Sequence, residues 1–71
     1  MNSNINFLLA NQHISAHVTM CGDQAEIVAD TARDLEAAIR VSIEDAERFE
    51  HETYTVSARY DRRAVLKMSS R

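Results

Sequence analysis

Proline is absent from this sequence, and glycine occurs only once, at Gly22. Flexible linkers and low-complexity segments depend on such residues, so the 71 residues are expected to form one domain without an internal linker. A chain of this length buries only about 60% of the surface that its unfolded form exposes. A homodimer or a larger partner would therefore add burial that a thin core cannot supply.

Cysteine and long hydrophobic runs are also scarce. Cys21 is the sole cysteine and cannot form an internal disulfide, which fits a reducing compartment. Near the start, the longest apolar run covers residues 7–10, which is too short to cross a membrane, and no positively charged stretch precedes it. These features predict a cytoplasmic protein without a membrane partner.

The two signs of charge are separated along the chain. Residues 23–52 contain ten acidic residues and three arginines, a balance of −7. Residues 53–71 contain five basic residues and one acidic residue, a balance of +4. The modest net charge of −3 therefore combines an acidic middle with a basic tail, and partners of either sign must be considered.

Residues 31–51 have the periodicity of an amphipathic helix. At 100° per residue, their less polar side chains fall within an arc of roughly 140°. The members of this arc are Ala32, Leu35, Ala38, Ile39, Ser42, Ile43, Ala46 and Phe49. Asp30 or Thr31 can cap the helix start. Val41 lies off the arc and is predicted to tolerate alanine.

Four other segments alternate in polarity as strands do. They are residues 13–21, 24–29, 53–60 and 64–69. Gly22 and Asp23 suit a two-residue type II′ turn between the first two segments. The predicted fold class is α+β, a ββαββ domain over residues 13–71 with a four-stranded antiparallel sheet and the helix on one face.

The strand parity also predicts which side chains the helix covers. The predicted core face of the sheet consists of Ile14, Val18, Ile27, Tyr54, Val56 and Leu66. Tyr60 shares the parity of Tyr54 and should face the core as well. Residues 1–12 are either a short edge strand, because their apolar residues alternate, or a docking arm. The order of the strands stays open.

Two histidines and the cysteine recur at every fourth position, as His13, His17 and Cys21. On a strand, positions four apart are separated by about 13 Å, whereas zinc ligands lie about 2.0–2.3 Å from one ion. The same separation keeps the thiol and the imidazoles out of hydrogen-bond reach. Phosphate loops, paired cysteines and nucleophile elbows are missing as well. We expect no metal, no cofactor, no catalytic residue and no enzymatic activity.

Two groups of charged residues are candidates for partner binding. The acidic set consists of Glu44, Asp45, Glu47, Glu50 and Glu52. Carboxylates in the last turns of a helix oppose its dipole by about 0.3–1 kcal/mol each, so stability alone would not place them there. The basic set consists of Arg59, Arg62, Arg63, Lys67 and Arg71. It could contact phosphates, although the chain is acidic overall and aromatic residues are not expected on the open sheet face. For both sets, a solvated surface without a partner is the alternative.

The stretch AEIVADTARDLEAAIRVS (residues 25–42), with a hairpin on either side, resembles small proteins encoded by phages and mobile elements. Some anti-CRISPR proteins have a similar ββαββ plan. The resemblance covers residues 13–68 in plan and size, and no functional residue is carried over. It implies a non-enzymatic inhibitor that binds a larger machine, often at a nucleic-acid-binding surface.

The leading functional expectation is therefore a small interaction protein that binds a larger protein or nucleoprotein complex through the acidic set. The alternative is a nucleic-acid-binding regulator that uses the basic set. A homodimeric structural module is the third candidate.

Overall fold

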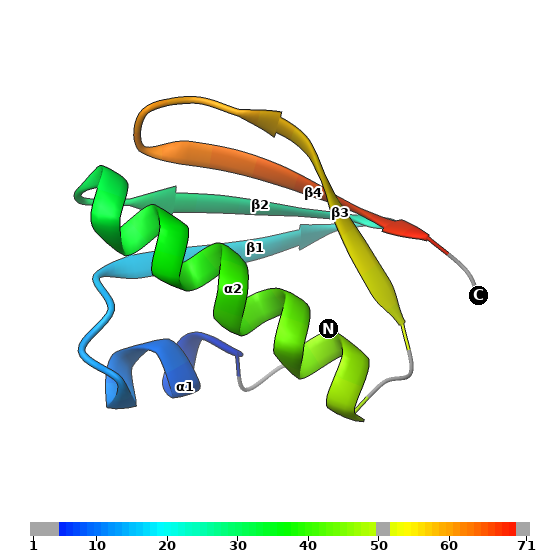
Figure 1. The fold of residues 1–71 in the computed structure, drawn as a ribbon, viewed down its shortest axis with the longest axis horizontal. Helices are drawn as coiled ribbons and strands as arrows, with labels where there is room; N and C mark the ends of the chain where they lie inside the picture. The colour runs from blue at the N-terminus through cyan, green and yellow to red at the C-terminus, as the bar shows by residue number, and fades with distance from the viewer. Residues whose placement is uncertain (1–4, 50–51, 70–71) are drawn as a thin grey trace.

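A computed structural model describes residues 5–49 and 52–69, without the side chain of Phe49 (Figure 1). Its elements are α1 (Ile5–Asn11), β1 (Ala16–Cys21), β2 (Gln24–Ala29), α2 (Ala32–Phe49), β3 (Thr53–Arg59) and β4 (Arg63–Ser69). The predicted ββαββ plan is confirmed, and a short helix precedes it. Neither helix in these ranges is both long and apolar enough to cross a membrane.

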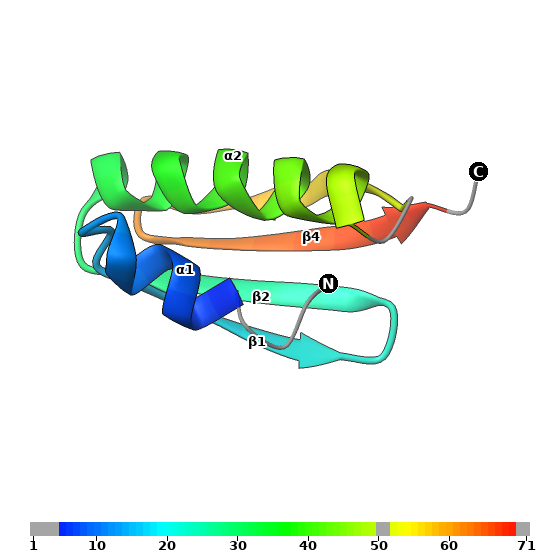
Figure 2. The ribbon, with the colours of Figure 1, turned by 90° about the horizontal axis from the view of Figure 1, so that it is seen from below.

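The four strands form one antiparallel sheet in the order β1-β2-β4-β3. Both helices lie on the same side of it, with α2 across the strands and α1 beside β1 (Figure 2). The core lies between these layers, where Ile27 of β2, Leu66 of β4 and Leu35 of α2 are fully buried. No described segment covers the other face of the sheet, which is called the open face below.

Local turn chemistry sets the boundaries of the first hairpin. Gly22 has a φ of 63° and begins the predicted two-residue turn, as a type II′ turn requires at its first position. His13 has a φ of 58°, and the N–H of the next residue, Ile14, donates to the carbonyl of Leu9 at 3.0 Å. These features form a Schellman motif that ends α1. His13 is therefore not in a strand, and β1 begins three residues later than the alternation suggested.

In place of the predicted edge strand or arm, the described part of residues 1–12 forms the helix α1, and residues 1–4 lie outside the described residues. Ile5 and Leu9, four residues apart, are buried against the core, whereas Phe7 between them is 70% exposed. Asn6 binds the outer edge of β1: its Nδ2 donates to the Val18 carbonyl at 2.9 Å, and the Val18 N–H donates to its Oδ1 at 2.7 Å. The amide thus satisfies backbone groups that an edge strand would otherwise leave open to another chain.

The buried side of α2 is wider than the predicted arc. Thr31 is the N-cap, because its Oγ1 accepts from the Asp34 N–H at 3.0 Å and donates to the Asp34 carboxylate at 2.9 Å. Ala32 is exposed, contrary to the prediction. Val41 lies off the predicted arc but is only 7% exposed, so the predicted arc was too narrow. The additional burial comes from α1, which packs beside α2.

The second hairpin differs from the prediction at two residues, and β3 contains a bulge. The register with β4 shifts between Val56 and Ala58, so strict alternation does not continue along the strand. Val56 pairs with Leu66 on the helix side but is 45% exposed, because it lies on an edge strand. Tyr60 follows the strand and is 62% exposed, so it is not a core residue. Tyr54 is buried as predicted.

The helical assignment of α1 predicts unequal effects at Leu9 and Phe7, which would lie on one face of a strand. Leu9→Ala should lower the free energy of unfolding by about 2–5 kcal/mol, because a fully buried leucine leaves a cavity. Phe7→Ala should change it by no more than about 0.5 kcal/mol. Urea unfolding followed by circular dichroism measures both. Equal losses would contradict the helix.

Tyr54 predicts a stability change at alkaline pH. Burial, and then the nearby carboxylates of Glu52 and Asp23, raise the pKa of its hydroxyl above the usual value. Above about pH 10 the unfolded chain loses this proton first, so unfolding releases a proton and stability falls as pH rises through the folded pKa. The urea midpoint should therefore decrease less in Tyr54→Phe than in the wild type above about pH 10. Tyr60→Phe controls for loss of an exposed phenol, and parallel profiles for Tyr54→Phe and the wild type would refute the prediction.

Candidate interaction surfaces

The residues of the acidic set do not share one exposed surface in the structure. Glu44 and Glu47 are exposed on the C-terminal half of α2. Asp45 is only 6% exposed, so its assignment to the outer acidic surface was wrong. It lies one helical turn after Val41, on the side that α1 covers. Glu52 is partly buried before β3, and Glu50 lies outside the described residues.

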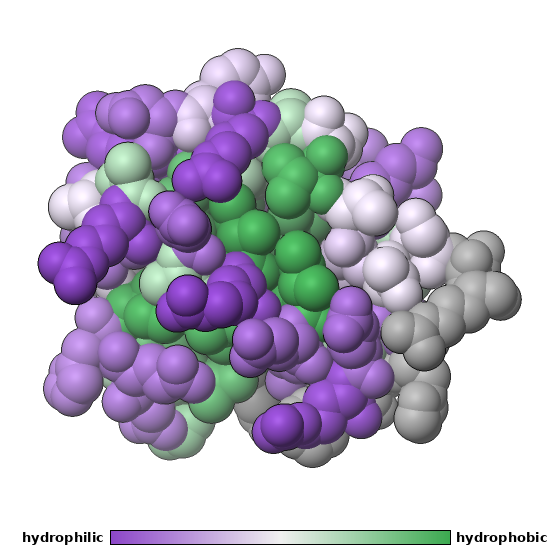
Figure 3. Space-filling view, viewed as in Figure 1, coloured by the Kyte–Doolittle hydropathy of each residue, from purple (hydrophilic) through white to green (hydrophobic). Residues whose placement is uncertain are grey.

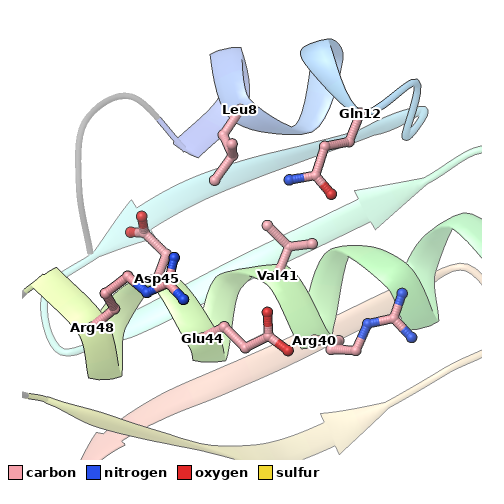
Figure 4. A pocket seen from close by; sticks show the side chains of 7 residues that line it. All are labelled: Leu8, Gln12, Arg40, Val41, Glu44, Asp45 and Arg48. Atoms are coloured by element: carbon pink, nitrogen blue, oxygen red, sulfur yellow. The ribbon is translucent and has the colours of Figure 1, made fainter.

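A groove of about 280 Å³ runs between the two helices (Figure 4). Leu8 points into it from α1 and Gln12 from the turn that follows, while Val41 and Asp45 point into it from α2. The remaining lining residues are Arg40, Glu44 and Arg48. Charged side chains surround apolar ones on this side of the molecule (Figure 3). The groove therefore combines an apolar wall with charged groups from one helix.

One oxygen of the Asp45 carboxylate lacks a partner within the described part of the protein. Its Oδ2 is buried and has no hydrogen-bond partner. Neither arginine of the groove closes an ion pair with it, and within residues 5–49 and 52–69 the ion pair present is Arg63–Glu26. A buried carboxylate without a partner loses hydration and gains no compensating contact. The isolated domain is therefore less stable with this side chain than with an apolar one.

The basic set does not form one surface. Arg63 and Lys67 alternate with the buried residues of β4 and lie on the open face, where Arg63 donates to Glu26 at 2.9 Å. Arg59 pairs with buried Ala64, so it lies on the opposite face of the sheet, on the side of the helices. Arg62 lies in the turn, and Arg71 is outside the described residues. The cations that the structure places are thus distributed over both faces.

The histidines and Cys21 are separated by the fold. His13 ends α1, whereas His17 and Cys21 are exposed on β1, four residues apart on one strand. The His17 ring contacts Thr19, with 3.5 Å between Nδ1 and Oγ1. Among the residues that the structure places, no group of three or more histidine, cysteine or acidic side chains could hold one metal ion.

No protein-family model, curated protein or solved structure matches this chain.

Sequence reasoning missed the groove because it missed α1. Leu8 and Gln12 belong to a segment whose apolar residues fit both a strand and a helix, since Ile5 and Leu9 satisfy the i,i+4 spacing and, with Phe7, also the alternation. The i,i+4 pair was the available signal. With α1 in place, the burial of Val41 and Asp45 would have followed from their spacing on α2.

The unpaired carboxylate predicts a stabilising substitution. Asp45→Ala should raise the free energy of unfolding by about 1–3 kcal/mol, because it removes a buried acceptor that lacks a donor. Glu47→Ala, an exposed neighbour on the same helix, should change it by no more than about 0.5 kcal/mol. Urea unfolding at neutral pH measures the difference. Destabilisation by Asp45→Ala would mean that the carboxylate has a stabilising partner.

Proposed function

We propose that this protein is a small non-enzymatic interaction protein that inhibits a larger protein or nucleoprotein complex by occupying its surface. The docking surface comprises the groove between α1 and α2 together with the exposed carboxylates of Glu44 and Glu47. The observation that carries the proposal is the buried Asp45 side chain, which lines the groove and whose Oδ2 has no hydrogen-bond partner. A partner that supplies a cation would remove the cost of that burial.

The surrounding charge supports a basic partner. Glu44 and Glu47 are exposed in the second half of α2, where they oppose the negative end of the helix dipole. Neither closes an ion pair within the described part of the chain. Unpaired surface charge of one sign accelerates association with a partner of the opposite sign.

The resemblance in plan to anti-CRISPR proteins of phages and mobile elements agrees with this mode of action. A chain of 71 residues offers little volume for an enclosed active site, but one helix layer is enough to cover part of a larger surface. Inhibition by occupancy requires only affinity and a complementary shape.

The nucleic-acid-binding alternative is less favoured by the geometry. A phosphate-binding surface gains affinity from cations that act together along one face. Here Arg59 differs in parity from Arg63 and Lys67, and Arg63 is already paired with Glu26. The aromatic residues nearest the hairpin are Tyr54, which is buried, and Tyr60, which lies beyond the sheet.

Two charge variants distinguish these functions. The double variant Glu44→Lys/Glu47→Lys should bind the partner recovered from a host lysate at least about tenfold more weakly at low salt, mainly through slower association. The double variant Arg59→Gln/Arg62→Gln is the matched control and should bind the partner like the wild type. Surface plasmon resonance across a salt series measures both rates.

The opposite pattern would overturn the proposal. Binding of DNA or RNA by the wild-type protein, with a steep salt dependence that is lost only in the arginine variant, would assign the function to the basic set. Circular dichroism should give the wild-type spectrum for both variants, since all four positions are exposed.

A further inference from the structure

We infer that the groove between α1 and α2 is a socket for a single arginine side chain of a partner protein, with its guanidinium placed against Asp45. This inference rests on the proposed function and specifies its chemistry. Asp45 is more than nine-tenths buried, lines the groove and has an unpartnered Oδ2. A ligand that enters the groove would contact the Asp45 side chain and could supply a donor to its carboxylate once that side chain turns toward the groove.

The lining of the groove matches the two parts of an arginine side chain. Leu8 and Val41 face one another from the two helices and supply an apolar wall for the methylene stem. Asp45, Glu44 and the side-chain amide oxygen of Gln12 supply acceptors at different positions around the groove (Figure 4). A planar guanidinium has five N–H donors for such a set, whereas an ammonium group has three.

The groove is large enough for one long side chain and lies at the lower end of the size range of small-molecule pockets. Pockets for drug-sized ligands and cofactors have volumes of about 300–1,000 Å³. The groove has about 280 Å³ and is partly open to solvent. An arginine that projects from a partner's surface could enter it without any backbone of the partner passing between the helices.

The groove's own arginines do not fill the socket. Arg40 and Arg48 line it, yet neither closes an ion pair with Asp45 in the described structure. Their positive charge repels a second cation from the rim, so the entering guanidinium is favoured only where it reaches the carboxylate. Arg48→Gln should therefore strengthen arginine binding several-fold, because it removes a like charge without removing an acceptor.

A blocked pentapeptide with one arginine between glycines is a direct probe. Its titration into the ¹⁵N-labelled full chain should cause saturable NMR shifts at the amides of Leu8, Val41 and Asp45. A peptide with citrulline, which keeps the shape but lacks the charge, should bind at least tenfold more weakly, and a lysine peptide several-fold more weakly. Asp45→Asn should lose at least tenfold, whereas Glu36→Gln, an exposed acid elsewhere on α2, should leave binding unchanged.

Several results would overturn the socket. They are equal binding of the arginine and citrulline peptides, equal binding of the lysine peptide, or an unchanged affinity in Asp45→Asn. The ¹⁵N spectrum of that near-isosteric variant verifies its fold in the same experiment. If sedimentation shows a wild-type dimer that Asp45→Asn dissociates, the occupant is an arginine of a second copy, which overturns the assignment to a different protein.

Failure of the socket and failure of the proposed function give different results. If Glu44→Lys/Glu47→Lys abolishes partner binding while Asp45→Asn affects neither partner nor peptide, the acidic surface is correct and the socket is wrong. If the arginine peptide binds through Asp45 but no protein partner depends on Glu44, Glu47 or Asp45, the proposed function is wrong.

Discussion

The docking of α1 against β1 and α2 determines much of the remaining structure. Leu9 is fully buried in the shared core, and the Asn6 amide holds the helix to the backbone of Val18 through two hydrogen bonds. The same docking closes one edge of the sheet, buries Val41 and forms the second wall of the groove. Without α1, the inner side of α2 would be narrower and Asp45 would be exposed to water.

This docking also explains why a stabilising core and an unfavourable carboxylate occur side by side. A domain of this size has only about 5–15 kcal/mol of stability, and a buried acceptor without a donor removes about 1–3 kcal/mol of it. Proteins accept such a loss where the side chain has a function that packing does not provide. Under the proposed function Asp45 would be such a side chain, because it lines the groove between the helices.

The elements that could be predicted from the sequence are those whose apolar residues follow a single spacing, either helical or alternating. α2, the turn at Gly22 and both hairpins followed from helical spacing, strand alternation and turn chemistry. Two features depend on tertiary context instead. The apolar residues of α1 fit both helical and strand spacing, and only the packing of Leu9 in the core selects the helix. The bulge after Val56 changes the face of the sheet to which the following side chains of β3 point, although polar and apolar residues alternate regularly along that strand. The groove could not be predicted because it requires α1, whereas the exposed Glu44 and Glu47 could.

The arrangement of charge gives the molecule two different faces. The exposed carboxylates of Glu44 and Glu47 belong to the helix layer, whereas Arg63 and Lys67 belong to the open face of the sheet. A partner that binds the helix layer therefore leaves those cations accessible, and the pairing of Arg63 with Glu26 reduces their attraction for phosphate. Glu44 and Glu47 are thus separated from Arg63 and Lys67 by the thickness of the sheet and its core, so binding at the helix layer need not compete with contacts at the open face.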